Sequence, residues 1–252
     1  MDREFEDLVA EAAAVPVDGW DFAWLDGRAT EERPSWGYAR LLAARMAEAG
    51  VALDVQTGGG EVLAGVGRRA PLTVAVESWP PNLARASVNL RPLGVHVVAA
   101  GDVPRLPLRA GTVDLVSARH PVTTWWDEIG RVLRPGGTFL SQQVGQATMA
   151  ELTEFFLGPQ PVDDSRSTGR AVAAAERAGM DVVDLRSESL LAEFHDVGAV
   201  VYFLRKVVWT VPGFEVDRYR DRLRAMHERI REGGSFQAYT KRFLVETRKR
   251  PA

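Results

Sequence analysis

Short apolar runs alternate with stretches of helical spacing from residue 51 to residue 189. Such alternation is typical of repeated βα units, in which a parallel sheet is buried on both faces. The pattern predicts strands at residues 52–55, 72–77, 96–100, 113–118, 138–142 and 181–189. It predicts helices at about residues 61–69, 81–91, 124–133 and 167–178. We therefore expect an α/β fold.

The two ends of the chain have a different pattern. Residues 2–14 and about 34–50 have helical spacing, and an aromatic-rich ordered loop is expected between them. A hydrophobic helix interrupts the sheet pattern within residues 191–214, and a charged helix at about 216–232 leads to an alternating last strand at 236–247. We expect an N-terminal helical cap at residues 1–50 and a main domain at 51–252, with a lid insertion at 191–214.

The amino-acid composition excludes several kinds of functional site. The 252 residues include no cysteine, which excludes disulfides, thiolate metal sites and a cysteine nucleophile. The four histidines are not at metal-ligand spacing, so no metal is expected. No run of eighteen apolar residues occurs and the N-terminus begins acidic, so we expect a cytoplasmic protein without a membrane partner.

Charge is unevenly distributed along the chain. The formal net charge is −3, yet residues 215–252 hold 11 Lys and Arg against 6 Asp and Glu. A solvated helix face and a charged strand explain this excess, and we favour that interpretation because the whole chain is acidic. The alternative is an anionic substrate or a nucleic acid.

A glycine-rich turn follows the first predicted strand of the main domain. The strand ends in Asp54, and Gly58, Gly59 and Gly60 precede a helix. A turn without side chains lets the backbone approach a ligand, and a helix N-terminus offers free N–H groups, so this geometry suits a nucleotide or nucleoside. Glu77 ends the next strand, where a carboxylate can accept hydrogen bonds from both ribose hydroxyls.

The order of motifs resembles class I S-adenosylmethionine-dependent methyltransferases with a methyltransferase type 11-like domain. The matching segments are Asp54-Val-Gln56-Thr-Gly58-Gly-Gly60, Glu77, Gly101-Asp102-Val103, Thr112-Val-Asp114-Leu-Val116 and Arg131-Val-Leu-Arg-Pro-Gly136-Gly137. The resemblance covers roughly residues 51–143. It implies a Rossmann-like, seven-stranded mixed sheet with helices on both faces and an antiparallel last strand.

The resemblance also implies a cofactor site. The loop from Asp54 to Gly60 would hold the methionine part of S-adenosylmethionine, Glu77 the ribose, and Asp102 the adenine amino group. The cofactor-binding residues expected in this way are Asp54, Gln56, Thr57, Gly58, Gly60, Glu77, Ser78, Trp79, Gly101, Asp102, Val103 and Arg119. Gln56 departs from the family, which usually has glycine there; its side chain would either crowd the methionine carboxylate or turn aside and donate a hydrogen bond to it.

Methyl transfer requires alignment of a nucleophile and, for some acceptors, removal of a proton. His120 is the candidate proton acceptor, because the end of the fourth strand faces the methyl group in this family. The alternative is a histidine that only hydrogen-bonds its loop. Candidate substrate-binding residues are Trp36, Tyr38, Trp125, Tyr202 and Arg205.

We therefore predict a methyltransferase that acts on a small-molecule acceptor, as a monomer or homodimer. One alternative is an RNA base (guanine-N) methyltransferase, since the inserted segment resembles part of the bacterial ribosomal-RNA guanine-N1 methyltransferases. Others are a non-catalytic cofactor-binding protein, favoured by Gln56, and an NAD-dependent oxidoreductase, disfavoured by the Gly101-Asp102 and Leu133-x-Pro-Gly-Gly motifs.

Overall fold

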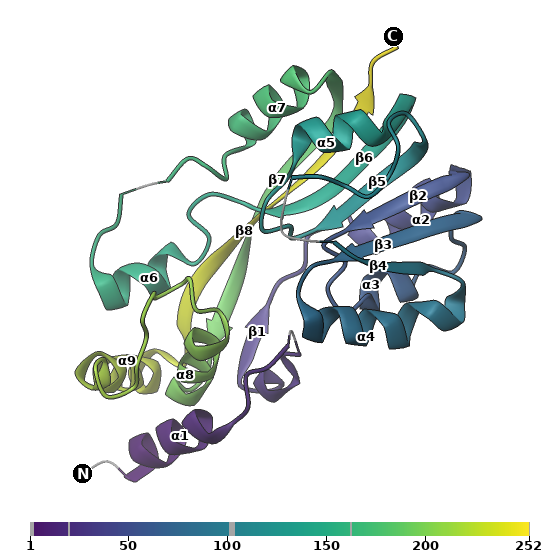
Figure 1. Ribbon diagram of the computed structural model, residues 1–252. Helices are drawn as coiled ribbons and strands as arrows, with labels where there is room; N and C mark the ends of the chain where they lie inside the picture. The colour runs from purple at the N-terminus through teal and green to yellow at the C-terminus, as the bar shows by residue number, and fades with distance from the viewer. Residues whose placement is uncertain (1–2, 20, 101–103, 162, 252) are drawn as a thin grey trace. The chain divides into compact units, whose positions relative to one another are not determined.

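A computed structural model describes residues 3–19, 21–100, 104–161 and 163–251 (Figure 1). The chain forms two compact units, which we describe separately. The helical unit comprises Met1–Arg33, Ala147–Asp163 and Ser189–Lys241, and the sheet unit comprises Pro34–Gln146, Asp164–Glu188 and Arg242–Ala252. Within the described residues, no helix combines the length and the apolarity that crossing a membrane requires.

The strands form one mixed sheet of order β1-β7-β8-β6-β5-β2-β3-β4. The neighbouring pairs β2–β3, β3–β4, β2–β5 and β5–β6 are parallel, whereas β8 pairs antiparallel with β6 and β1 antiparallel with β7. The strand bounds are β1 (Ala29–Glu31), β2 (Val51–Val55), β3 (Leu72–Glu77), β4 (His96–Ala99), β5 (Val113–Arg119), β6 (Leu133–Val144), β7 (Met180–Phe194) and β8 (Phe236–Lys249).

The central strands are apolar on both faces because helices cover both. Alternate residues of β2 enter different core clusters: Ala52 packs toward α2, α3 and α4, and Leu53 packs toward α5 and α7. Figure 1 shows α3 and α4 on one side of the strands and α5 and α7 on the other. The helices are α2 (Tyr38–Glu48), α3 (Glu61–Ala64), α4 (Pro80–Leu90), α5 (Trp126–Val132) and α7 (Thr168–Arg177), with the 3-10 turn η2 (Arg91–Leu93) after α4.

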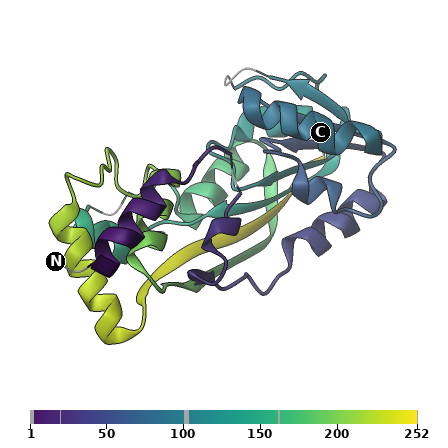
Figure 2. The same cartoon turned by 90° about the horizontal axis from the view of Figure 1, so that it is seen from below.

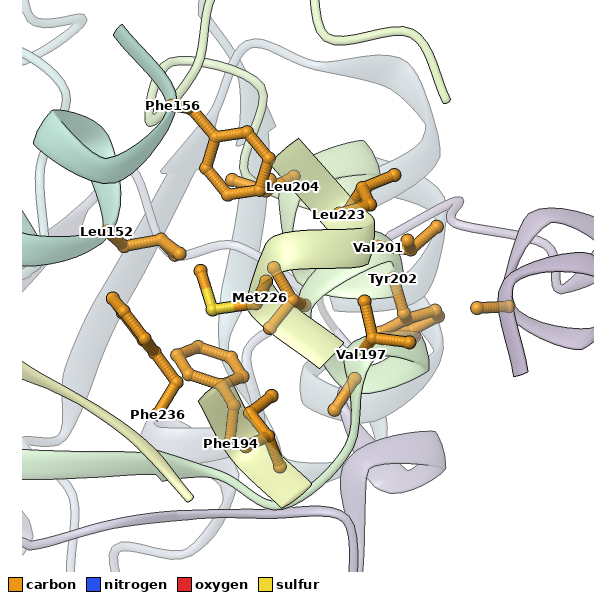
Figure 3. Close-up of a cluster of buried hydrophobic side chains, with 14 of the residues drawn as sticks. Leu152, Phe156, Phe194, Val197, Val201, Tyr202, Leu204, Leu223, Met226 and Phe236 are labelled. Atoms are coloured by element: carbon orange, nitrogen blue, oxygen red, sulfur yellow. The ribbon is translucent and has the colours of Figure 1, made fainter. Parts of the chain in front are cut away.

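The helical unit has its own apolar core. Its elements are α1 (Arg3–Ala14), η1 (Ala23–Leu25), α6 (Ala150–Leu157), α8 (Val197–Lys206) and α9 (Arg220–Gly233). The view from below shows α1 beside α8 and α9 (Figure 2). Phe156, Phe194, Leu204, Met226 and Phe236 come from different elements and pack into one buried cluster (Figure 3).

The predicted Rossmann-like α/β fold with an antiparallel last strand is confirmed, but the predicted count of seven strands is wrong. In the described residues the sheet has eight, because Ala29–Glu31 pairs with Ala192, Glu193 and Phe194 of β7. This strand has three residues and no buried one, so its sequence carries no alternation that could reveal it.

The bounds of other elements also differ from those predicted from the sequence. The helix expected at 61–69 ends at Ala64, where Gly65 caps it. Within the segment expected as an insertion at 191–214, β7 continues to Phe194 before α8 begins. The sheet unit begins at Pro34, and α2, which lies within the expected N-terminal cap, packs in the core of that unit. The domain bounds at residue 50 stay a prediction.

Candidate functional site

The glycine-rich loop between β2 and α3 places its glycines in two different environments. Gly58 has φ of +62°, and a Cβ added there would meet no atom within 4 Å. Gly60 has φ of +80°, and its Cβ would lie 2.6 Å from Cδ1 of Leu90 on α4. Gly60 is therefore required for close packing against α4, whereas Gly58 leaves open space beside the loop for a ligand.

The Glu77 carboxylate holds the ends of two loops together. Oε2 accepts from the Gly58 N–H at 2.8 Å, and Oε1 accepts from the N–H groups of Ser78 at 2.8 Å and Trp79 at 3.0 Å. Three backbone donors on one buried carboxylate fix its position at the carboxyl end of β3. The side chains of Ser78 and Trp79 themselves are exposed.

Asp54 is a buried acid at the carboxyl end of β2. It lies directly opposite Ser117 of β5, whose hydroxyl donates to Oδ1 at 2.5 Å. Burial raises the pKa of Asp54 to about 6, against the opposing effect of the Ser117 hydrogen bond, and the negative charge of Glu77 raises it further. A cationic ligand group beside Asp54 would favour its ionised form.

Two buried hydroxyl groups near Asp54 lack a well-aligned hydrogen bond. Among the described residues, Tyr38 Oη and Thr57 Oγ1 form none of good geometry, although Thr57 lies close enough to Asp54, and Tyr38 close enough to the Ala118 backbone, to affect the pKa values of Asp54 and Tyr38. Burial raises the pKa of Tyr38 well above its usual value, Asp54 adds to this rise, and the Arg119 guanidinium opposes it. Tyr38 therefore lies close to both a negative and a positive group. Such a set suits a zwitterionic ligand, with Asp54 for its ammonium and Arg119 with Tyr38 for its carboxylate.

The Gln56 side chain turns aside from the loop, as the second sequence-based alternative expected, but its hydrogen bonds do not support the expected bond to the methionine carboxylate. Its Nε2 donates to the Thr123 carbonyl at 2.7 Å, and its Oε1 accepts from the Val122 N–H at 2.7 Å. The space at Gly58 contains no Gln56 atom. The substitution of glycine by glutamine therefore leaves the loop open, and both hydrogen bonds go to backbone rather than to a ligand.

His120 is held as a neutral ring by a chain of side-chain hydrogen bonds. Trp36 Nε1 donates to Gln142 Oε1 at 2.8 Å, which directs Gln142 Nε2 toward His120 Nε2 at 2.8 Å. An amide nitrogen only donates, so His120 Nε2 accepts and the ring proton lies on Nδ1. Burial lowers the pKa of His120 to about 3, and the positive charges of Arg119 and Arg242 contribute. His120 Nε2, the ring nitrogen that would accept a proton in catalysis, thus already accepts a hydrogen bond from Gln142.

The remaining predicted residues are dispersed. Trp125 precedes α5 and packs against the core beneath it. Tyr202 and Arg205 lie in the helical unit, where the Tyr202 hydroxyl donates to Asp21 O at 3.1 Å and Arg205 Nη1 donates to Ala12 O at 2.6 Å. The substrate role of these residues stays a prediction. Gly101, Asp102 and Val103 lie outside the described residues.

Sequence reasoning missed Ser117 and Gln142. Ser117 binds Asp54 across two strands, and Gln142 joins Trp36 to His120 across 106 and 22 positions of the chain. Both are polar residues near the carboxyl ends of buried strands, which is a signal for a buried site. That signal does not name the partner, since strand order decides which side chains meet.

The strand order and the motifs at the carboxyl ends of β2, β3 and β5 resemble those of class I, S-adenosylmethionine-dependent methyltransferase domains. Residues 53–141 match the family model described as a methyltransferase domain. Over 134 residues the chain is 31% identical to malonyl-[acyl-carrier protein] O-methyltransferase of Dechloromonas aromatica (strain RCB). That match covers 46% of this chain and 50% of the relative, so the chain spans half the length of the curated relative.

Solved structures share the fold. A putative methyltransferase from Bacillus halodurans C-125 has a TM-score of 0.62 at 17% identity, over 86% of this chain and 99% of that one. Geranyl diphosphate methyltransferase in complex with S-adenosylmethionine has a TM-score of 0.51 at 15% identity, over 84% of each chain. The fold is therefore that of methyltransferases well beyond the segment matched by the family model.

Proposed function

We propose that this chain transfers a methyl group from S-adenosylmethionine to a small-molecule acceptor. The observation that carries the proposal is the set of buried polar groups beside the open loop at Gly58. Tyr38 and Thr57 have buried hydroxyls without a well-aligned hydrogen bond, and Asp54 and Arg119 carry opposite charges near Tyr38. The methionine part of the cofactor carries one ammonium and one carboxylate, which these groups match.

Different residues of the sheet unit would bind different parts of the cofactor. Asp54, Tyr38 and Arg119 would bind the methionine part, with the loop backbone at Gly58 beside it, and Glu77 would receive the ribose through the lone pair that its backbone donors leave on Oε2. When bound, the cofactor supplies a sulfonium-activated methyl group. The chain's own task is to align the acceptor with that group and to exclude water.

The acceptor that suits this site is an oxygen already ionised at neutral pH, such as a carboxylate. His120 is neutral, its Nε2 is taken, and its Nδ1–H is a donor, so it would orient an anionic acceptor rather than deprotonate a neutral one. The similar protein from Dechloromonas aromatica is named as an O-methyltransferase of a malonyl group, which agrees with an oxygen acceptor. The proton-acceptor role predicted for His120 is not part of this proposal.

Ligand-dependent unfolding tests the cofactor assignment. S-adenosylmethionine and S-adenosylhomocysteine should each raise the melting temperature of the full chain, and NAD should not, because a ligand stabilises only the state that binds it. A rise with NAD alone would refute the proposal. Transfer of an isotope-labelled methyl group from S-adenosylmethionine to a panel of carboxylates, alcohols and amines then tests the acceptor, with label expected on the carboxylates.

The other candidate functions have less support. A non-catalytic protein was favoured by Gln56, yet that side chain leaves the space at Gly58 free. An RNA base methyltransferase was favoured by the basic C-terminal segment, yet Arg220, Arg224 and Arg250 of that segment pair with carboxylates of the chain itself.

A further inference from the structure

Gln56 has an unusual backbone conformation for its residue type. Its φ is +54°, in the left-handed region that glycine adopts without strain. For a residue with a Cβ this conformation is strained. A chain with glycine at this position would avoid that strain, so here an interaction of the Gln56 side chain must offset it.

The offsetting interaction is a two-point contact with the segment that follows β5. The Gln56 amide donates to Thr123 O and accepts from Val122 N, both at 2.7 Å. Two such hydrogen bonds are enough to balance the backbone strain of one residue. Because the donor and the acceptor lie on one amide group, neither a shorter side chain nor a carboxylate reproduces both contacts.

The segment from His120 to Trp125 has few other attachments. At its start the His120 N–H donates to Gln142 O at 2.7 Å, and His120 itself has φ of +55°. Pro121 has no N–H to donate, and Val122 is 83% exposed. In the described part of the chain, Gln56 is the hydrogen-bond partner that holds the middle of this segment to the sheet unit.

We propose that Gln56 is a positioning residue that joins the glycine-rich loop to the segment carrying His120. A ligand that orders the loop at Gly58 then also orders residues 121–125, so that cofactor binding prepares the side of the site where the acceptor is oriented. This coupling rests on the proposed function, but the contact itself does not. In relatives with glycine at this position the same side-chain link cannot form.

Hydrogen exchange of the full chain tests the link with and without S-adenosylhomocysteine. Without ligand, the Val122 N–H should exchange about fivefold to tenfold faster in Gln56→Gly than in the original chain. The reason is that the variant lacks Gln56 Oε1, the acceptor of this N–H. With ligand, exchange should slow at residues 56–60 and 122–126 in the original chain, but only at 56–60 in Gln56→Gly. Gln56→Asn tolerates the left-handed conformation but is one methylene shorter, so it should behave as Gln56→Gly does.

A matched control variant, Asn89→Ala, removes a different hydrogen bond from the same glycine-rich loop. Asn89 Nδ2 on α4 donates to Gly59 O at 2.8 Å, and Asn89→Ala should leave the ligand-dependent slowing at 122–126 intact. Equal slowing at 122–126 in Gln56→Gly and in the original chain would overturn the proposal. A general loss of stability would instead accelerate exchange everywhere without removing the ligand-dependent difference. If the ligand fails to bind the original chain, the proposed function fails, and the ligand-free comparison still tests the link.

Discussion

At the scale of single residues, burial decides the charge states in this site. Asp54 and His120 are both shifted toward their neutral forms, yet each remains hydrogen-bonded, Asp54 by Ser117 and His120 by Gln142. A buried acid with a raised pKa binds its proton more tightly in the folded chain than in the unfolded one. Its contribution to stability therefore depends on pH in a defined direction.

We predict that Asp54 makes the folded chain less stable as pH rises through its titration range. With a pKa of 3.8 in the unfolded chain and about 6 in the folded one, the folded state holds more protons between these values. The free energy of unfolding of the original chain should therefore fall relative to that of Asp54→Asn, by about 2 kcal/mol between about pH 4.5 and pH 7. Urea unfolding at several pH values measures the difference; parallel curves for the two proteins would show that Asp54 titrates normally.

We predict that His120 stays neutral across the physiological range. Its proton NMR signals, assigned by their loss in His120→Asn, should not shift between about pH 5 and pH 8, because its pKa is about 3. Gln142→Leu removes the donor that stabilises the neutral ring and should raise the pKa of His120. A midpoint near 6.5 in the original chain would restore His120 as a candidate proton acceptor.

At the scale of elements, the loop between β2 and α3 combines two requirements in one short segment. It must let α4 pack closely through Leu90, and under the proposed function it must also leave space for the cofactor. The backbone donors of Gly58, Ser78 and Trp79 converge on Glu77 and so join the two βα turns. Different glycines meet the two requirements, which makes them separable by substitution.

We predict that two glycine-to-alanine changes differ in their effects on stability and on ligand binding. Gly60→Ala places a Cβ 2.6 Å from Leu90 at φ of +80°, so unfolding free energy should fall by about 2–3 kcal/mol. Gly58→Ala meets no atom within 4 Å and should lose only about 1 kcal/mol, for its φ of +62°. Because its Cβ enters the proposed ligand space, Gly58→Ala should weaken binding of S-adenosylhomocysteine at least about tenfold, or about 1.4 kcal/mol. Denaturation and calorimetry measure both; unchanged affinity in Gly58→Ala would place the ligand elsewhere.

At the scale of the whole molecule, the basic C-terminal segment is engaged internally. Within the helical unit, Arg220 and Arg224 pair with Glu6, and Arg229 lies over the Phe236 ring. Within the sheet unit, Arg250 pairs with Asp181 at 2.7 Å. Cations that already have partners contribute less to attraction of a phosphate backbone, and the net charge of the chain is −3.

We predict that the chain does not bind RNA specifically. A fluorescent single-stranded or hairpin RNA should bind no tighter than the micromolar range at about 50 mM salt, and more weakly still at about 200 mM. Fluorescence anisotropy measures this, and a labelled methyl group should not enter total RNA. Tight binding with methyl incorporation would favour the RNA base methyltransferase instead.

Local patterns predicted the central strands well because these strands are apolar on both faces and short. The expected strand at 72–77 agrees with β3, and the expected strands at 96–100 and 113–118 differ from β4 and β5 by one residue at one end. The three-residue β1 escaped prediction, and α6 was not expected at all. Strand pairing creates the first of these elements, and the packing of Leu152 and Phe156 into the helical core stabilises the second.

The sequence alone determined the fold class and the position of the glycine-rich turn, because glycine turns and apolar strands act locally. The tertiary structure alone decided which polar side chains meet: Asp54 with Ser117, Gln142 with both Trp36 and His120, and Gln56 with the segment after β5. These partners lie far apart in the chain, and only strand order and register bring them together. Burial of Asp54 and His120 beside these partners then shifts the pKa of each toward its neutral form. A local sequence pattern does not reveal such a shift, because it does not show which residues become buried together.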